Sequence, residues 1–157
     1  MKNVLITGGT EFFAQRVARG LNEQFKVIFG DSKAIPKILL ESGRYIDLPL
    51  TSRISFNHEL LSSALDHNVD IIIPLRKREI VQLSACKDLF HEYDITLVVP
   101  AFESLKHLQF ISNPGKGFIP NVLVNGESLN TEKLSLKGYT GVCSDTAEGV
   151  LLCCLDD

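Results

Sequence analysis

The sequence predicts an α/β fold: a doubly wound parallel sheet with strand order 3-2-1-4-5, followed by a small C-terminal β-rich extension. Three observations predict it. Short runs that are apolar throughout alternate with segments whose apolar residues recur at helical spacing. Such runs are typical of parallel strands that helices cover on both faces. A glycine pair, Gly8-Gly9, follows the first run directly, as in the strand-to-helix turn of a Rossmann-like fold.

Five apolar runs give the expected strands, and each one ends at a turn residue. They are Asn3–Thr7, Phe25–Phe29, Arg44–Leu48, Val69–Ile73 and Ile95–Val99. Glycine follows the first two runs, and proline follows the other three directly, which stops a strand. Right-handed crossovers between these strands give the predicted order.

The segments between these runs are expected to be helical. In the first helix, Thr10 serves as cap, and Phe13, Val17 and Leu21 form one apolar face. Further helices are expected at residues 34–42, 55–65, 78–93 and 103–111.

Composition divides the chain near Ser112. Residues 1–111 carry 13 basic and 13 acidic side chains, whereas residues 112–157 carry 3 and 6 and hold 6 of the 11 glycines. We therefore expect a Rossmann-like domain over 1–111 and a short β-rich tail over 112–157. The tail is expected to form a small antiparallel unit at the sheet edge, with strands at 119–124, 133–136, 139–143 and 150–155.

Charge and hydropathy exclude several classes of protein. With 45% hydrophobic and 22% charged residues, the chain of 157 residues is neither disordered nor collagen-like. Its net charge of −3 argues against a nucleic-acid partner, because duplex-DNA binders carry basic surfaces. No apolar run approaches the roughly 20 residues of a membrane span, and the N-terminus has no secretory pattern. We expect a cytoplasmic protein with no membrane partner.

The cysteines and histidines indicate no metal centre. Cys86, Cys143, Cys153 and Cys154 lack the spacing of a zinc site, so we interpret them as small buried hydrophobes, with a redox or metal role as the alternative. The four histidines belong to no hydrolase or metal motif. The sequence names no catalytic residue and no particular cofactor.

Ligands of doubly wound sheets bind at the carboxyl ends of the strands, where the winding reverses. Here that crevice lies between the ends of the first and fourth strands. The candidate ligand-binding residues that the topology places there are Gly8, Gly9, Thr10, Asp31, Pro74, Leu75 and Arg76.

Three of these positions have both a chemical and a structural interpretation. Gly8-Gly9 at a helix N-terminus suits a phosphate or serves only as a tight turn, and Glu11 places a carboxylate where a pyrophosphate would lie. Asp31, 23 residues after Gly8, accepts ribose hydroxyls or caps the next helix. Arg76 binds a carboxylate or phosphate, or is a solvated helix start.

Taken in order, several of these segments resemble the N-terminal pre-ATP-grasp domain of ATP-grasp ligases, particularly the carbamoyl-phosphate-synthase-large-subunit-like group. The segments are Asn3-Val-Leu-Ile-Thr-Gly-Gly9, Gly30-Asp31-Ser32, Val69-Asp-Ile-Ile-Ile-Pro-Leu75 with Glu79, Ile95-Thr-Leu-Val-Val-Pro100 and Gly117-Phe-Ile-Pro120. The resemblance covers residues 1–124. It implies a Rossmann-like fold that shapes the acceptor-substrate side of a site, and it adds Ser32 and Glu79 to the candidate ligand-binding residues.

In that family a following ATP-grasp domain binds Mg-ATP, and this sequence does not contain it. We therefore expect no independent ligase activity. The first hypothesis is a non-catalytic module for a small anionic ligand or nucleotide, or a subunit of a split ligase with a separate ATP-grasp subunit. The second is an NAD(P)-binding reductase or epimerase-like protein, although no Tyr-x-x-x-Lys pair is present. The third is a structural or interaction module whose acidic tail forms a homodimer or partner surface.

Overall fold

The predicted parallel sheet is confirmed in its class and its strand order. The computed structural model describes residues 1–132 and 134–156. Five strands form the sheet in the order β3-β2-β1-β4-β5, with neighbouring strands parallel. They are β1 (Lys2–Ile6), β2 (Phe25–Asp31), β3 (Tyr45–Asp47), β4 (Ile71–Ile73) and β5 (Thr96–Leu97). Leu5 in β1 is paired with Ile28 on one side and with Ile72 on the other, so β1 is the centre of the sheet.

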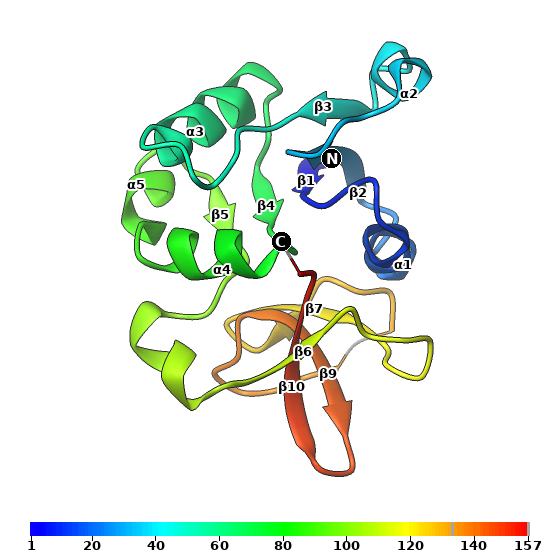
Figure 1. Cartoon of the computed structure of the whole chain (residues 1–157). Coiled ribbons are helices and arrows are strands. Elements are labelled where there is room, and N and C mark those ends of the chain that lie inside the picture. Colours follow the sequence, from blue (N-terminus) through cyan, green and yellow to red (C-terminus); the bar gives the residue numbers. More distant parts are fainter. Residues whose placement is uncertain (133, 157) are drawn as a thin grey trace.

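Helices cover the two faces of this sheet unequally. The α-helices are α1 (Phe12–Gly20), α2 (Lys37–Glu41), α3 (Phe56–Asp66), α4 (Lys77–Ser84) and α5 (Lys87–His91). Helices α3, α4 and α5 lie on one side and α1 on the other (Figure 1). No helix of the described residues is long and apolar enough to cross a membrane.

The expected cap of the first helix is wrong: α1 begins after Glu11, and the Thr10 hydroxyl donates to Asp31 instead. Two further helices differ from the structure. The segment 78–93 is divided into α4 and α5, because Cys86 takes the non-helical angles φ −129° and ψ 29°. The break turns α5 so that Phe90 is completely buried. The segment 103–111 is a 3-10 helix, η1 (Phe102–His107), followed by strand β6 (Gln109–Ser112). Gln109–Ser112 form a strand because they pair with β10, a distant segment. The local sequence of 109–112 does not indicate this pairing.

The tail forms a second five-stranded sheet in the order β6-β10-β9-β7-β8. Its remaining strands are β7 (Asn121–Val124), β8 (Glu127–Ser128), β9 (Gly141–Thr146) and β10 (Gly149–Cys154). The sheet is mixed rather than antiparallel, since β6 runs parallel to β10. Of the strand expected at 133–136, residues 134–136 are irregular and Lys133 lies outside the described residues.

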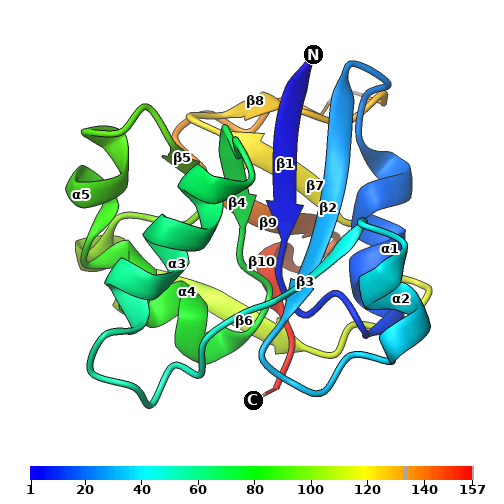
Figure 2. The ribbon, with the colours of Figure 1, turned by 90° about the horizontal axis from the view of Figure 1, so that it is seen from above.

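The second sheet lies behind a face of the parallel sheet and not at its edge, as Figure 2 shows from above. Val122 and Val142 pack in one cluster with Val4, Ile6 and helix α1. Leu123, on the alternate face, packs in the cluster that also holds the α3 side chains. The expected boundary near Ser112 falls at the end of β6, and the two sheets share their hydrophobic clusters. The second sheet therefore covers the area beside α1 that a helix covers in most doubly wound folds.

This shared core predicts that both sheets unfold together. Leu123 is completely buried, so Leu123→Ala is expected to lower the free energy of unfolding by about 2–5 kcal/mol. Urea unfolding followed by circular dichroism tests this, with Ile119→Ala, an exposed aliphatic residue four positions earlier, as the control. Two separate transitions in the wild-type protein would contradict a single shared core.

Candidate functional site

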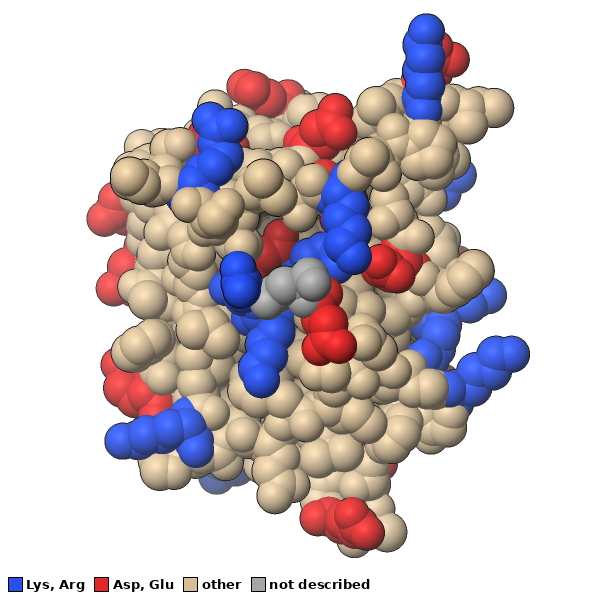
Figure 3. Space-filling view, in the orientation of Figure 1, with Lys and Arg blue, Asp and Glu red and all other residues tan. Residues whose placement is uncertain are grey.

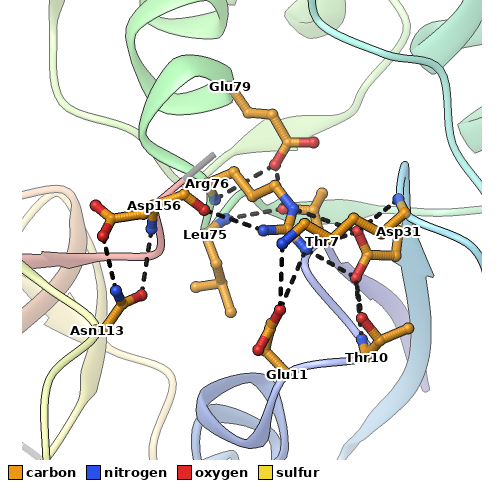
Figure 4. Close-up of polar contacts among 10 residues, drawn as sticks. Thr7, Thr10, Glu11, Asp31, Leu75, Arg76, Glu79, Asn113 and Asp156 are labelled. Carbon is orange, nitrogen blue, oxygen red and sulfur yellow. Dashed lines mark hydrogen bonds and ion pairs between the residues drawn. The ribbon is translucent and has the colours of Figure 1, made fainter.

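The structure brings five of the sequence-predicted residues into one polar network at the carboxyl ends of β1, β2 and β4 (Figure 4). They are Thr10, Asp31, Leu75, Arg76 and Glu79. Thr7, the last residue of the first predicted strand and not one of the candidate ligand-binding residues, joins them. Gly8 and Gly9 form the turn beneath them. The described contacts of Ser32 and Pro74 include no hydrogen bond to this network.

A buried ion pair forms the centre of the network. Asp31 ends β2, and Arg76 is the residue before α4, with β1 between their strands. The guanidinium donates from Nη2 to both carboxylate oxygens of Asp31 at 2.9 and 3.0 Å, and from Nε at 3.2 Å. The side chains of Asp31 and Arg76 are 0% and 5% exposed. Arg76 is therefore not a solvated helix start, which was the structural interpretation of its position.

Backbone and hydroxyl donors complete the surroundings of Asp31. Thr10 donates to Oδ2 from its hydroxyl at 2.5 Å and from its backbone N–H at 3.1 Å, and the backbone of Lys33 donates to Oδ1 at 3.1 Å. Burial alone would raise the pKa of Asp31, but these hydrogen bonds and Arg76 hold it below its ordinary value. The Asp31 side chain therefore caps no helix. Its carboxylate oxygens, which would accept the ribose hydroxyls of a dinucleotide, already accept hydrogen bonds from the protein itself.

Glu79 is the second buried acid of the network. The Thr7 hydroxyl donates to its Oε1 at 2.6 Å and accepts a hydrogen bond from the backbone N–H of Leu75 at 2.8 Å. Burial raises the pKa of Glu79 to about 7, against the lowering effects of Thr7 and Arg76. This residue therefore carries a proton in much of the folded protein at neutral pH, and its contacts tie the end of β1 to the start of α4.

Residues Cys154–Asp156, here called the closing segment, lie across the crevice. The backbone of Leu155 accepts a hydrogen bond from Lys77 N–H at 2.9 Å and donates one to the Leu75 carbonyl at 2.7 Å. The carbonyl of Asp156 accepts a hydrogen bond from Arg76 Nη1 at 3.1 Å. A Cβ atom on Gly8, whose φ is +63°, would lie 2.6 Å from Leu155 Cδ1. The chain therefore covers its own glycine turn.

Glu11 is the half-exposed member of this group of charges. Its carboxylate lies 3.8 Å from Arg76 Nη2 and 3.7 Å from Lys33 Nζ, and its side chain is 40% exposed. Figure 3 shows basic and acidic side chains side by side near the middle of this face. The sequence places a carboxylate at the position of a pyrophosphate, and in the structure this carboxylate lies beside the buried guanidinium.

The cysteines pack in the hydrophobic clusters. Cys143, Cys153 and Cys154 are buried, and Cys86 is half-buried. Burial raises the pKa of Cys143 and of Cys153 to about 12, so both remain thiols. Within residues 1–132 and 134–156, no group of three or more His, Cys, Asp or Glu side chains is placed to hold a metal ion.

Fold and site together define a Rossmann-like α/β module whose crevice is filled by its own charged residues and by its closing segment. No protein-family model matches the chain, and no curated protein matches it significantly.

The raised pKa of Glu79 predicts a pH-dependent stability. Because the folded protein holds the proton up to about pH 7 and the unfolded chain only up to about 4.5, stability falls as pH rises between these values. The free energy of unfolding of the wild type should fall by about 3 kcal/mol relative to that of Glu79→Gln over this range. Urea titrations at several pH values measure it. Glu92 is an exposed glutamate directly after α5, and Glu92→Gln should show the same pH dependence as the wild type. Parallel pH profiles for the wild type and Glu79→Gln would refute the raised pKa of Glu79.

The contact between Gly8 and Leu155 predicts an energetic coupling. Gly8→Ala is expected to destabilise by about 1–2 kcal/mol through its positive φ, and further through the clash with Leu155. In a Leu155→Ala background the clash is absent, so the two substitutions should show a coupling of about 1 kcal/mol in a double-mutant cycle measured by urea unfolding. Gly43→Ala is the control, because Gly43 has φ +75° and no atom within 4 Å of an added Cβ. If the effects of Gly8→Ala and Leu155→Ala on the free energy of unfolding were additive, Leu155 would not contact the Gly8 turn in solution.

Proposed function

We propose that this chain is a non-catalytic ligand-binding module of the pre-ATP-grasp type, in which Arg76 binds a small anionic ligand or the phosphate of a nucleotide. The observation that carries the proposal is the Glu11 carboxylate beside the Arg76 guanidinium, at the glycine turn. The protein's own anion lies at the place where a Rossmann-like fold receives a phosphate.

Replacement of Glu11 by a ligand is energetically reasonable. An ion pair that involves a side chain as exposed as Glu11 contributes about 0–1 kcal/mol, so little stability is lost when it breaks. Asp31 stays in place and holds the guanidinium oriented. A guanidinium binds phosphate and carboxylate with the same planar set of donors, so Arg76 suits both anions.

The same geometry supports binding without turnover. A general acid or base must reach the reacting atoms and be able to exchange a proton near neutral pH. Asp31 has a lowered pKa, and Glu79, whose pKa is suitable, is completely buried behind Thr7. In this proposal the phosphoryl chemistry belongs to a separate ATP-grasp subunit, as the family resemblance implies.

Access to Arg76 requires the closing segment to move. Leu155 is buried over Gly8, and the Asp156 carbonyl takes one donor of the guanidinium. We therefore expect weak binding by the isolated chain, because part of the binding energy is used to displace this segment.

Calorimetry of the purified chain with Mg-ATP, ADP, NAD(H) and NADP(H) tests the proposal. Adenine nucleotides should bind without hydrolysis, and Glu11→Gln should bind them about tenfold more tightly, since a like charge next to the phosphate is removed. Glu23→Gln, an exposed glutamate just beyond α1, makes the same change of net charge away from the crevice and should bind as wild type.

Three outcomes would count against this function. If no nucleotide bound to either the wild type or Glu11→Gln in calorimetry, the crevice would not be a nucleotide site. Hydrolysis of ATP would contradict the non-catalytic assignment. Tighter binding of the dinucleotides than of ATP would favour the reductase-like hypothesis.

A further inference from the structure

A second concavity lies away from the crevice, between η1, the end of β5 and the second sheet. It has a volume of about 400 Å³, within the range of small-molecule sites. Residues from five segments line it, and none of them belongs to the polar network around Arg76. The side chains that matter most are Lys87, His107, Tyr139, Cys143, Val150 and Leu152.

The lining combines apolar and polar side chains. Cys143 and Leu152 are buried side chains of β9 and β10, and Val150 is partly buried beside them. Lys87 is the one Lys or Arg among the described lining residues, and His107 and Tyr139 also line the cavity. None of the described lining residues is Asp or Glu, although the whole chain has a net charge of −3. A cavity of this kind favours an anion over a cation.

Lys87 lines this cavity and also an adjoining concavity that holds Asp88 and Glu103. Its Nζ donates to the carbonyl of Val99 at 2.9 Å, which fixes the side chain and uses one of its three N–H groups. Burial lowers the pKa of Lys87, and the neighbouring Asp88 only partly opposes this. Burial has removed part of the hydration that stabilises the charged ammonium group, and an anion beside Nζ would stabilise that charge again.

We infer that this cavity is a binding site for a small organic acid, with its carboxylate on Lys87 and an apolar body against Val150 and Leu152. The proposal goes beyond the proposed function, because it uses none of the residues of the Arg76 crevice. The site is one for reversible binding: the one thiol among its described lining residues, that of Cys143, has a pKa raised to about 12 and is not nucleophilic at neutral pH.

Phenylacetate and its neutral analogue phenylacetamide are suitable probes, because they share a shape and differ in charge. Titrations followed by ¹H–¹⁵N spectra of the full chain should show phenylacetate binding at least tenfold more tightly than the amide. The shifts should centre on lining residues such as Ala101, Ser104 and Thr140. Lys87→Met should remove the preference for the acid, whereas Lys106→Met, an exposed lysine of η1 that does not line the cavity, should keep it.

A second variant tests the location independently of Lys87. Ser104 lines the cavity and is exposed, so Ser104→Phe is expected to obstruct it without disturbing the core, and Ser104→Ala should bind as wild type. The inference would be overturned by equal affinity for the acid and the amide, or by no binding at 20 mM phenylacetate. It would also be overturned by shifts that centre on the Arg76 crevice, or by unchanged binding to Lys87→Met or Ser104→Phe. Since the probe carries no phosphate, its failure leaves the nucleotide test of the crevice unaffected.

Discussion

The buried ion pair of Asp31 and Arg76 is the interaction on which the carboxyl edge of this fold depends. It joins the ends of β2 and β4 across β1, two strands that are not neighbours in the sheet. Burying two charges is unfavourable by several kcal/mol per ion unless hydrogen bonds satisfy them. Here Thr10, Lys33 and the Asp156 carbonyl supply those bonds, so the loops after β1, β2 and β10 are fixed by the same pair.

The second sheet packs on the parallel sheet and meets the crevice at the end of β10. After β5 the chain forms no long helix, and the area beside α1 is covered by β7, β9 and β10. Strand β10 continues into the closing segment, whose backbone bonds to Leu75 and Lys77 continue the edge beyond β4. The tail thus has two roles in the structure: it completes the hydrophobic core with its strands and it supplies an acceptor to Arg76 with its end.

How far the sequence predicts this structure depends on the range of the interactions. Strands such as Val69–Ile73 are recognisable because burial on both faces requires an unbroken apolar run, and chirality then fixes their order. Residues 109–111 of β6 are predicted as the end of a helix, because the strand that pairs with them, β10, lies about forty residues further along. Likewise the crevice residues were predicted from topology, but the bond between Thr7 and Glu79 spans 72 positions and leaves no periodic signal. The closing segment was predicted as a strand, not as a cover for Gly8.

The two proposed sites differ in how the protein treats their cations. At the crevice, Arg76 already has the carboxylates of Asp31 and Glu11 beside it. An anion that replaces Glu11 therefore contributes only the difference between its own interaction energy with Arg76 and that of Glu11. That exchange favours a ligand with more than one charge, such as a nucleotide polyphosphate. In the cavity beside η1 none of the described lining residues is an acid, and Asp88, next to Lys87 in the sequence, only partly offsets the burial of its ammonium group. A single carboxylate bound there would therefore still stabilise the charge of Lys87. Under the two proposals, the crevice would suit polyanions and the cavity would suit simple organic acids, although the chain has a net charge of −3.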